Sequence, residues 1–432
     1  MARVTAPSLS RSLARLIRSR QATDADRQHA LRFVRDWLAS AVAGSATDPG
    51  RRLLRYASGT SSIEGDAFLL AALSHITETD DLHRASITHP GCVVVPVALT
   101  LGRAHNRPPP AILDAVLAGY EAMIRVGEAL GPAHYRIFHN TATAGPFGSA
   151  AAAATLLGLD EEQWVWAFGS AGTQAAGLWQ FNADATMSKP LHAGHAAEAG
   201  LKAALLAGNG FTGAERILEG DRGFFRALCP DPTPERVLAE APGWKLPETS
   251  IKPYPSCRHT HPAIDAALRL RDRICPATAI GAIEIESYPA ALDLTDNANP
   301  ESTAAAKFSI QFCVAAALVR GRPGLAAFEG AGLSDPVVRG LLGRSTARTA
   351  PDLAANYPAR WGARVTVRGD GAEWTESQAT ASGDPEDPLT DRELEAKARD
   401  LLTHGGLSRD QVERWWADPL GTDVVGGLRG LA

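Results

Sequence analysis

The segment from residue 138 to residue 220 constrains the fold most strongly, because Ala, Gly and Leu dominate it. Apolar periodicity predicts helices within it at 147–157, 160–177 and 193–208. Small side chains such as those of Ala150–Ala154 leave little bulk between neighbouring helices, so helix backbones can approach closely. The segment therefore predicts a tight, multi-layered helical bundle. No repeat of fixed period points to a solenoid.

The same segment carries ionisable side chains that helix packing does not require. They are His139, Lys189, His192 and His195. Burying a charge without a partner is costly, and the usual outcome is a shifted pKa. Polar groups within small-residue helices therefore indicate a ligand pocket.

The first 250 residues are predicted to be helical throughout, with further helices near 24–42, 63–77 and 108–131. Residues 1–20 hold five arginines and no acidic residue, and Leu9, Leu13, Leu16 and Ile17 share one helical face. We favour an amphipathic helix that packs on the body of the protein. The same composition is shared by mitochondrial transit peptides, which is the alternative.

The pattern changes near residue 250. Residues 279–288 alternate as a strand does, and 364–368 and 373–380 flank a Gly-Asp-Gly turn typical of a β-hairpin. Helices are predicted at 302–320, 336–343 and 390–402. We predict a mostly α fold: a large all-helical domain over 1–250, completed by 390–432, and a smaller α+β lid domain over 251–389.

Composition limits the classes of function. The 432 residues suffice for two domains, and 45% hydrophobic with 21% charged residues is typical of a globular protein. A net charge of −5 without a basic block argues against nucleic acid as a partner. The five cysteines form no CxxC pair, so a reducing, cytoplasmic location is expected. No apolar run reaches the roughly 18 residues that a membrane span requires, so no membrane partner is predicted.

Residues 75–91 form a polar loop between two apolar segments and contain His75, Asp80, Asp81, His83 and His89. Carboxylates and imidazoles in such a loop are suited to acid–base chemistry, because histidine titrates nearest to neutral pH. The alternative is a solvated junction in which Asp80 caps a turn. His89, which lies directly before Pro90-Gly91 and an apolar run, is the strongest functional candidate.

Two further candidates precede small-residue helices. His139 and Lys189 each stand where a helix N-terminus offers unpaired N–H groups, which favour a bound carboxylate. His192 and His195 lie three residues apart and are either core histidines or part of the site. Glu198 is the nearest third ligand for a metal, but no i, i+4 pair is present, so we predict no metal site.

The segment 252–259 holds Lys252, Cys257, Arg258 and His259 beside two prolines, near the expected domain boundary. Lys252 with Arg258 would suit a carboxylate, because a guanidinium binds two oxygens at once. A rigid linker is the alternative, and a Cys257–His259 nucleophilic pair is the weaker one. We find no GxGxxG, GxxxxGK[ST] or GxSxG motif, so the chemistry is expected to use side chains without a cofactor.

Six segments together resemble the MmgE/PrpD family. They are 36–45 (DWLASAVAGS), 75–99, 138–159, 189–220, 252–268 (KPYPSCRHTHPAIDAAL) and 304–318. The resemblance implies a helical domain with an α+β lid domain, an active site between them, homodimers, and no metal, flavin or nicotinamide. It also implies 2-methylcitrate dehydratase, cis-aconitate decarboxylase or iminodisuccinate epimerase activity.

Within that resemblance, His89, His139, Lys189 and Lys252 match the family's active-site positions, and Asp80 and Asp81 match its paired aspartates. We place Asp80, Asp81, His192, Cys257 and Arg258 in substrate binding. Cys257 stands where decarboxylases and methylcitrate dehydratases carry a histidine, and Phe312 where decarboxylase-like members carry a tyrosine. The loop also departs from the family's DT…HPS pattern. These departures indicate a divergent branch.

The expected activity is that of a lyase of the dehydratase type, which abstracts the α-proton of a hydroxy acid rich in carboxylates. An epimerase or isomerase of a dicarboxylate and a decarboxylase are the alternatives, and a non-catalytic family member is the least favoured. In this scheme the lysines hold the carboxylates, while one histidine takes the proton and another assists departure of the leaving group.

Overall fold

The computed structural model describes residues 6–59, 62–184, 186–274 and 280–431. Arg3, Cys275 and Ala279, to which the expectations above extend, lie outside this part of the chain. The chain divides into two compact units. The helical unit comprises Met1–Ile76, Asp80–Thr249 and Leu401–Ala432, and the mixed unit comprises Thr77–Thr79 and Ser250–Asp400. The fold is mostly helical with a smaller α+β part, as predicted.

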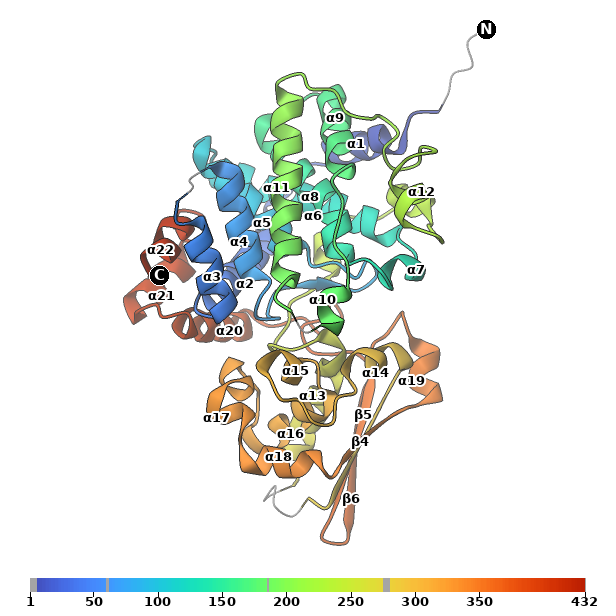
Figure 1. The fold of residues 1–432 in the computed structure, drawn as a ribbon, viewed down its shortest axis with the longest axis vertical. Helices are drawn as coiled ribbons and strands as arrows, with labels where there is room; N and C mark the ends of the chain where they lie inside the picture. The colour runs from blue at the N-terminus through green and yellow to red at the C-terminus, as the bar shows by residue number, and fades with distance from the viewer. Residues whose placement is uncertain (1–5, 60–61, 185, 275–279, 432) are drawn as a thin grey trace. The chain divides into compact units, whose positions relative to one another are not determined.

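The helical unit is built almost wholly from helices (Figure 1). Its helices are α1 (Leu9–Ser19), α2 (Asp24–Ser45), α3 (Asp48–Ala57), α4 (Ile63–Ser74), α5 (Pro90–Ala104), α6 (Pro109–Glu128), α7 (Pro132–Tyr135), α8 (Asn140–Leu157), α9 (Glu161–Gly172), α10 (Gln180–Ala183), α11 (Lys189–Gly208), α12 (Phe224–Leu228), α21 (Arg409–Ala417) and α22 (Val424–Leu431). Short strands β1 (Leu82–His83) and β2 (Thr249–Ser250) and the 3-10 turns η1 (Pro234–Leu238) and η2 (Leu246–Glu248) complete it. No helix among the described residues combines the length and apolar character that crossing a membrane requires.

Local capping explains where the outer helices begin. Thr23 and Asp26 form a reciprocal capping box at the start of α2, and Asp160 and Gln163 form another at α9. The amphipathic N-terminal segment folds as α1 and packs against α9. Its Arg11 forms ion pairs with Glu161, Glu162 and Glu215.

The inner helices α6, α8 and α11 meet through their backbones. A Cβ placed on Gly200 of α11 would lie 2.2 Å from the carbonyl oxygen of Pro146 in α8. A Cβ on Gly148 of α8 would lie 2.9 Å from the carbonyl oxygen of Gly119 in α6. Helix α8 begins at Asn140, seven residues before the predicted start, because the helix accommodates Pro146 in its interior. The small residues thus serve the close packing that the sequence indicates.

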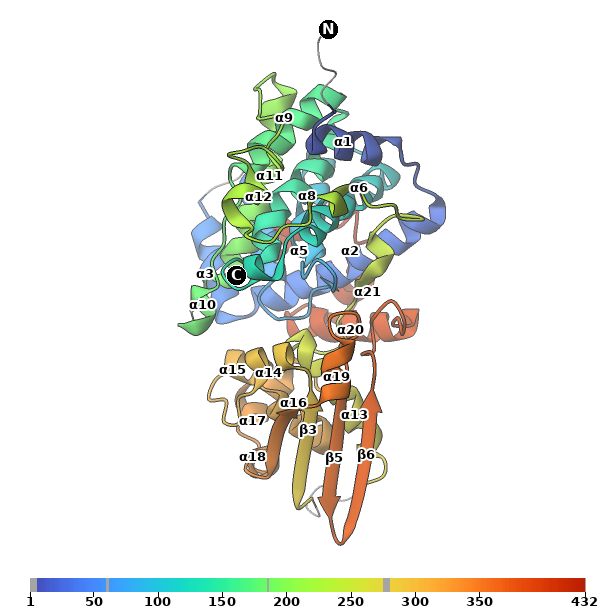
Figure 2. The same cartoon turned by 90° about the vertical axis from the view of Figure 1, so that its right-hand side faces the viewer.

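The mixed unit contains a four-stranded sheet of order β4-β3-β5-β6. Figure 2 shows β3, β5 and β6 of this sheet. Its strands are β3 (Ala282–Ser287), β4 (Ser345–Thr349), β5 (Ala363–Gly369) and β6 (Ala372–Gln378). Strand β3 runs parallel to β4 and antiparallel to β5, and β5 and β6 form the predicted hairpin. Asp370 and Gly371 have φ angles of 49° and 76°, the left-handed pair that a two-residue hairpin turn requires.

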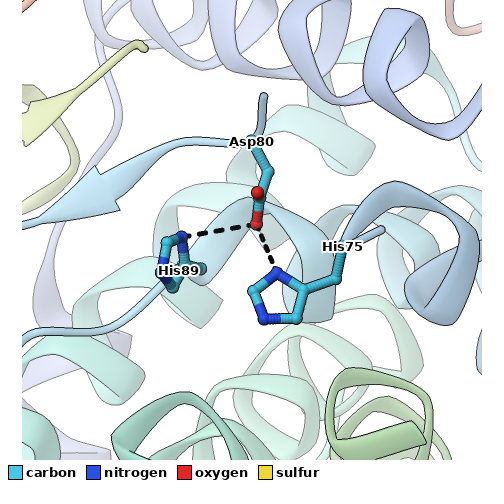
Figure 3. Close-up of side chains that lie close together, drawn as sticks. All are labelled: His75, Asp80 and His89. Atoms are coloured by element: carbon cyan, nitrogen blue, oxygen red, sulfur yellow. Dashed lines mark hydrogen bonds and ion pairs between the residues drawn. The ribbon is translucent and has the colours of Figure 1, made fainter. Parts of the chain in front are cut away.

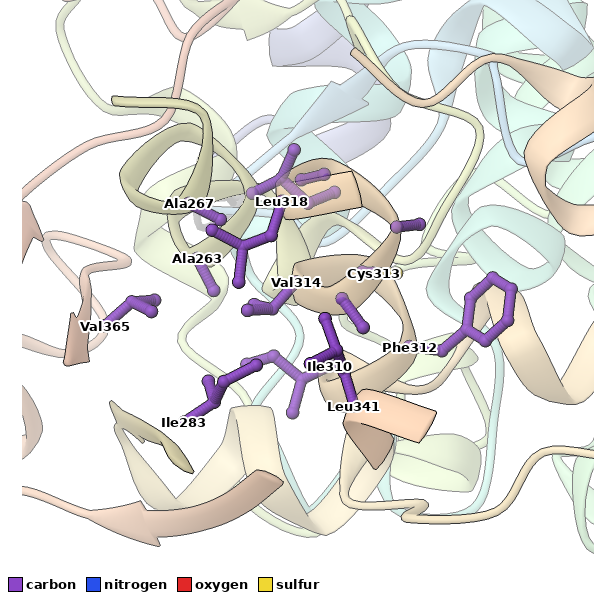
Figure 4. Packing of buried hydrophobic residues seen from close by; sticks show 14 of the residues in the cluster. Ala263, Ala267, Ile283, Ile310, Phe312, Cys313, Val314, Leu318, Leu341 and Val365 are labelled. Atoms are coloured by element: carbon purple, nitrogen blue, oxygen red, sulfur yellow. The ribbon is translucent and has the colours of Figure 1, made fainter. Parts of the chain in front are cut away.

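Helices α13 (His261–Arg271) and α16 (Ile310–Arg320) pack against this sheet and share its hydrophobic cluster. The other helices of the mixed unit are α14 (Pro289–Thr295), α15 (Thr303–Lys307), α17 (Gly330–Leu333), α18 (Pro336–Leu342) and α19 (Pro351–Asn356), with the 3-10 turns η3 (Arg258–Thr260) and η5 (Leu325–Phe328). Helix α20 (Asp391–His404) follows the sheet in sequence. Ile283 and Val365 of the sheet pack in one cluster with Ile310 and Val314 of α16 (Figure 4). The helix predicted over 302–320 is two helices, because Ser309 accepts a hydrogen bond from Phe312 N and starts a new one.

Candidate active site

The loop between α4 and α5 brings three of its polar side chains together (Figure 3). His75 is the residue that follows the last turn of α4, and His89 is the residue that precedes the first turn of α5. Their rings lie 4.9 Å apart between centroids at an angle of 63°. Asp80 lies between them: its Oδ2 is 2.6 Å from His75 Nδ1 and 3.4 Å from His89 Nδ1. All three side chains are buried.

The partner of each imidazole Nδ1 fixes where the proton sits. His89 Nδ1 lies 2.6 Å from the backbone oxygen of Asp81, and a carbonyl can only accept a hydrogen bond. His89 Nδ1 therefore carries the proton, and Nε2 is the proton-accepting atom of the neutral ring. By the same reasoning His75 Nδ1 donates to Asp80, and among the described residues His75 Nε2 has no hydrogen-bond partner.

His139, the N-cap residue of α8, adds a third imidazole to this cluster. Its ring stacks on that of His75, with planes 11° apart, and its centroid lies 6.3 Å from that of His89. On its other side, His139 Nδ1 is 3.3 Å from His192 Nδ1, and the ring of Trp179 lies 4.8 Å away between centroids. The structure thus brings His89, His139 and His192 together with His75.

The electrostatic surroundings keep two of these rings neutral. Burial, followed by the charges of His75 and Lys189, holds the pKa of His139 well below its ordinary value of 6.5. Burial lowers the pKa of His192 to about 4, and His75 and Lys189 again contribute. Lys189 is the first residue of α11, one turn before His192. A neutral imidazole beside a fixed cation is suited to accept a proton from an anionic molecule.

Asp81 lies in the same loop but contacts other groups. Its carboxylate accepts hydrogen bonds from Gly91 N and from the Tyr120 hydroxyl, the latter at 2.7 Å. Burial raises the pKa of Asp81 to about 8, while the Tyr120 hydroxyl and Gly91 N oppose that rise. A role for Asp81 in substrate contact stays a prediction.

Two groups of side chains in the described residues are close enough to suggest a metal: His75, Asp80 and His89, and His83, Glu128 and Glu248. In the first, His89 Nδ1 must carry a proton for the Asp81 carbonyl, so it has no lone pair to offer there. In the second, Lys245 Nζ forms ion pairs with both Glu128, at 3.1 Å, and Glu248, at 3.0 Å, so the two carboxylates already share a cation. Both groups fit hydrogen-bonded clusters.

The mixed unit holds the remaining predicted residues. Lys252 is buried, with Nζ 3.4 Å from both the backbone oxygen and Oε2 of Glu78. Lys307 and Lys397 donate to the neighbouring backbone oxygens of Thr77 and Thr79, at 2.8 and 2.7 Å. Three ammonium groups therefore bind three successive carbonyls. Sequence reasoning did not single out Lys307, although it lies in the segment 304–318, or Lys397, which lies in none of the six segments.

Arg258 is buried and donates from Nη2 to Asp384 at 2.5 Å, while its Nε and Nη1 have no hydrogen-bond partner among the described residues. Cys257 donates its backbone N–H to the carbonyl of Lys307. His259 Nδ1 lies 2.5 Å from the Tyr288 hydroxyl, and its ring stacks on Trp361. His259 is thus held by aromatic partners, which weakens the case for a Cys257–His259 pair.

His195 fits the core alternative, whereas His75 departs from the sequence expectation. His195 Nε2 donates to the carbonyl of Gln174 at 3.0 Å, as a core histidine would. His75 belongs to the centre of the cluster, although we did not place it among the site residues. Its signal was the position of a histidine at a helix C-terminus five residues before an aspartate.

Comparison with known proteins identifies the class. Residues 11–237 match the MmgE/PrpD N-terminal domain and residues 254–417 the MmgE/PrpD C-terminal domain. The chain therefore belongs to the MmgE/PrpD family, as its motifs predicted. Membership of this family supports lyase activity of the dehydratase or decarboxylase type at the level of the family.

Three relatives are named for one reaction. The cis-aconitate decarboxylase of Homo sapiens is 30% identical over 360 residues, covering 80% of this chain and 74% of the relative. That of Mus musculus is 28% identical over 424 residues, covering 90% and 85%. A cis-aconitate decarboxylase-like protein of Aspergillus oryzae is 26% identical over 376 residues, covering 81% and 76%.

Proposed function

We propose that this protein is a lyase that acts on a small acid with two or more carboxylates, by removing a proton next to a carboxylate. The main support is a buried cluster in which Asp80 contacts His75 and His89, and His139 stacks on His75. The charge of Lys189 acts on this cluster. A neutral imidazole supplies the base. The fixed ammonium stabilises the negative charge that develops on the adjacent carboxylate.

We assign the proton steps for the dehydratase reaction as follows. Neutral His139 takes the proton from the carbon next to a carboxylate, and the electron pair forms the new carbon–carbon double bond. The hydroxyl on the neighbouring carbon departs with a proton from Nε2 of a second imidazole, for which His89 is the candidate. That ring enters the step as an imidazolium and ends it neutral, so that water leaves. Lys189 binds a carboxylate. Family resemblance adds Lys252 and Arg258 as carboxylate-binding residues in this proposal.

A decarboxylase is the second candidate, because the three relatives described above are named for cis-aconitate decarboxylation or resemble such enzymes. In that reaction a carbon–carbon bond to a carboxylate breaks, carbon dioxide leaves, and the remaining carbanion takes a proton. A protonated imidazole would then act as the acid. Epimerisation would return the proton to the opposite face, and no observation favours it over the two lyase reactions.

Proton NMR in D₂O separates these reactions. The purified protein would be incubated with citrate, 2-methylcitrate, cis-aconitate, iminodisuccinate and related hydroxy acids. We expect a new vinyl signal from a hydroxy acid, which would support the dehydratase. Product from cis-aconitate with release of carbon dioxide would support the decarboxylase instead, and deuterium at an α-carbon without a vinyl signal the epimerase. If Lys189→Ala and His139→Ala both kept near wild-type kcat/KM on the confirmed substrate, the proton scheme would be wrong.

We further propose a cytoplasmic homodimer that binds this small carboxylate and neither nucleic acid nor membrane. Light scattering after size exclusion, at several protein concentrations, tests the dimer. A mass that equals one chain throughout would contradict it.

A further inference from the structure

Asp81 holds the start of α5 through its carboxylate. Both oxygens accept from Gly91 N, at 3.0 and 3.2 Å, and Oδ2 also accepts from the Tyr120 hydroxyl. Gly91 is the second residue of α5, and the N-cap residue His89 makes no capping bond with its own side chain. Asp81 therefore supplies the cap that His89 does not, from eight residues upstream.

The backbone of Asp81 holds the ring of His89 at the same time. The Asp81 carbonyl accepts from His89 Nδ1 at 2.6 Å, and His89 N donates to Thr141 Oγ1 at 3.0 Å. His89 is thus fixed through its ring by Asp81, through its backbone by Thr141, and through Gly91 by the Asp81 carboxylate. One residue secures both the helix start and the imidazole that precedes it.

The Tyr120 hydroxyl packs tightly against Gly91 and the Asp81 side chain. A Cβ on Gly91 would lie 2.8 Å from the Tyr120 hydroxyl and 3.0 Å from Asp81 Oδ1. Tyr120 is fully buried in α6, and its ring meets Phe33 edge to face with centroids 5.6 Å apart. This packing holds the Tyr120 hydroxyl against the Asp81 carboxyl group.

We propose that Asp81 and Tyr120 are positioning residues that lock His89 in one orientation and one tautomer, with Nδ1 protonated and Nε2 ready to exchange a proton. This proposal rests on the proposed function, in which His89 handles a proton. Asp81 acts here through His89 rather than by touching the substrate. We call these contacts of Asp81 and Tyr120 the His89 clamp. Loss of the clamp would let the His89 ring rotate and populate the other tautomer, which slows the proton step but leaves binding of the carboxylates intact.

The test uses Tyr120→Phe, which removes one hydroxyl and keeps the ring against Phe33. Histidine labelled with nitrogen-15 would be followed by NMR, and the His89 signals would be assigned by their loss in His89→Gln. In the wild type we expect a pyrrole-like shift at Nδ1 and a pyridine-like shift at Nε2. In Tyr120→Phe we expect both shifts to move toward averaged values, kcat to fall by up to about 10²-fold, and KM to stay nearly constant.

Ser149→Ala is the matched control, because it too removes one buried hydroxyl, which donates to the Ala197 carbonyl at 2.6 Å. It should leave the His89 shifts and kcat unchanged. A pyridine-like Nδ1 in the wild type, or unaltered His89 shifts in folded Tyr120→Phe, would overturn the clamp. The NMR measurement needs no substrate. If the protein reacted with none of the acids, the proposed function would be contradicted, whereas the His89 shifts would still test the clamp.

Discussion

The rings of His75 and His139 stack with planes 11° apart and centroids separated by 5.4 Å, although one ends α4 and the other begins α8. Two buried imidazoles at this distance disfavour carrying positive charge together, and a charge on His75 lowers the pKa of His139. The pair therefore resists taking up a second proton. This property makes the cluster responsive to changes in neighbouring charge.

The Lys189 ammonium should control the acid limb of the pH profile. Because the neutral imidazole is the active base and the pKa of His139 lies below 6.5, wild-type kcat/KM should fall only below that pH. Removal of a nearby cation makes protonation easier, so Lys189→Met should raise the histidine pKa values and move the acid limb to higher pH. The pH dependence of kcat/KM measures this. Lys202→Met, which removes an exposed lysine of the same helix, should not move it, and an equal shift in both variants would contradict the assignment.

His139→Asn should reduce kcat/KM by about 10²-fold to 10⁴-fold, the usual contribution of a positioned general base. The comparison is His105→Asn, since His105 is exposed and follows α5. Steady-state kinetics on the confirmed acid, with melting temperatures for both proteins, provide the measurement. Retention of activity in folded His139→Asn would show that another group takes the proton.

Asp80→Asn should impair catalysis through His75. The carboxylate accepts from His75 Nδ1 at 2.6 Å, and an amide in its place can present a donor and so favour the wrong tautomer. We expect kcat to drop by about 10²-fold or more with a small change in KM. Steady-state kinetics test this expectation. The control is Asp410→Asn, which removes an exposed carboxylate in α21. A rise in KM alone would instead assign Asp80 to substrate binding, as we first predicted from the sequence.

The buried ion pair between Arg258 and Asp384 should contribute strongly to the stability of the mixed unit. Asp384 accepts from Arg258, from Ser250 Oγ and from Ala381 N, and both charged side chains are almost fully buried. Asp384→Ala should lower the free energy of unfolding by about 3 to 5 kcal/mol, because it leaves Arg258 as a buried charge without its partner. Urea titration measures this. Glu373→Ala breaks the half-exposed pair with Arg368 and should cost about 1 kcal/mol or less. Similar costs for both variants would refute the burial argument.

Two glycine substitutions should act in opposite directions. A Cβ on Gly44 of α2 would lie 1.9 Å from the Leu73 carbonyl of α4, whereas one on Gly340 of α18 would meet nothing within 4 Å. Gly44→Ala should destabilise by about 1 to 3 kcal/mol through overpacking. Gly340→Ala should stabilise by about 0.4 to 1 kcal/mol, because alanine narrows the unfolded ensemble. Thermal and urea unfolding of both variants test the packing of α2 on α4.

Most of the fold could be predicted from the sequence, because the patterns that predict its helices and its hairpin involve residues close together in the chain. Helix caps such as Thr23 with Asp26 and the Gly371 turn depend on residues a few positions apart. Strand β4 was missed, since its sequence START shows no apolar alternation and its pairing with β3 joins residues some sixty positions apart. Such a partner is set by the tertiary fold and leaves little local trace.

The candidate site was predictable to a similar degree. His139 and Lys189 precede or begin a helix of small residues, and His89 precedes Pro90-Gly91 and an apolar run, features that a single sequence displays. The place of His75 depends on a turn that brings Asp80 back to the end of α4, with Glu78 at a φ angle of 59°. Tyr120 comes from the middle of α6, where a buried aromatic residue is ordinary. Only the three-dimensional packing marks these two residues.

The backbone contact between α6, α8 and α11 limits how this protein could change during evolution. At glycines such as Gly200, the backbone of one helix lies directly against a carbonyl of the next. Exchange of side chains therefore offers little room to reshape the interior at these contacts. His75, His89, His139 and Lys189 all stand at helix ends, outside those contacts. New substrate preferences should therefore arise through the loops at these helix ends, while the helices themselves remain nearly invariant as a frame.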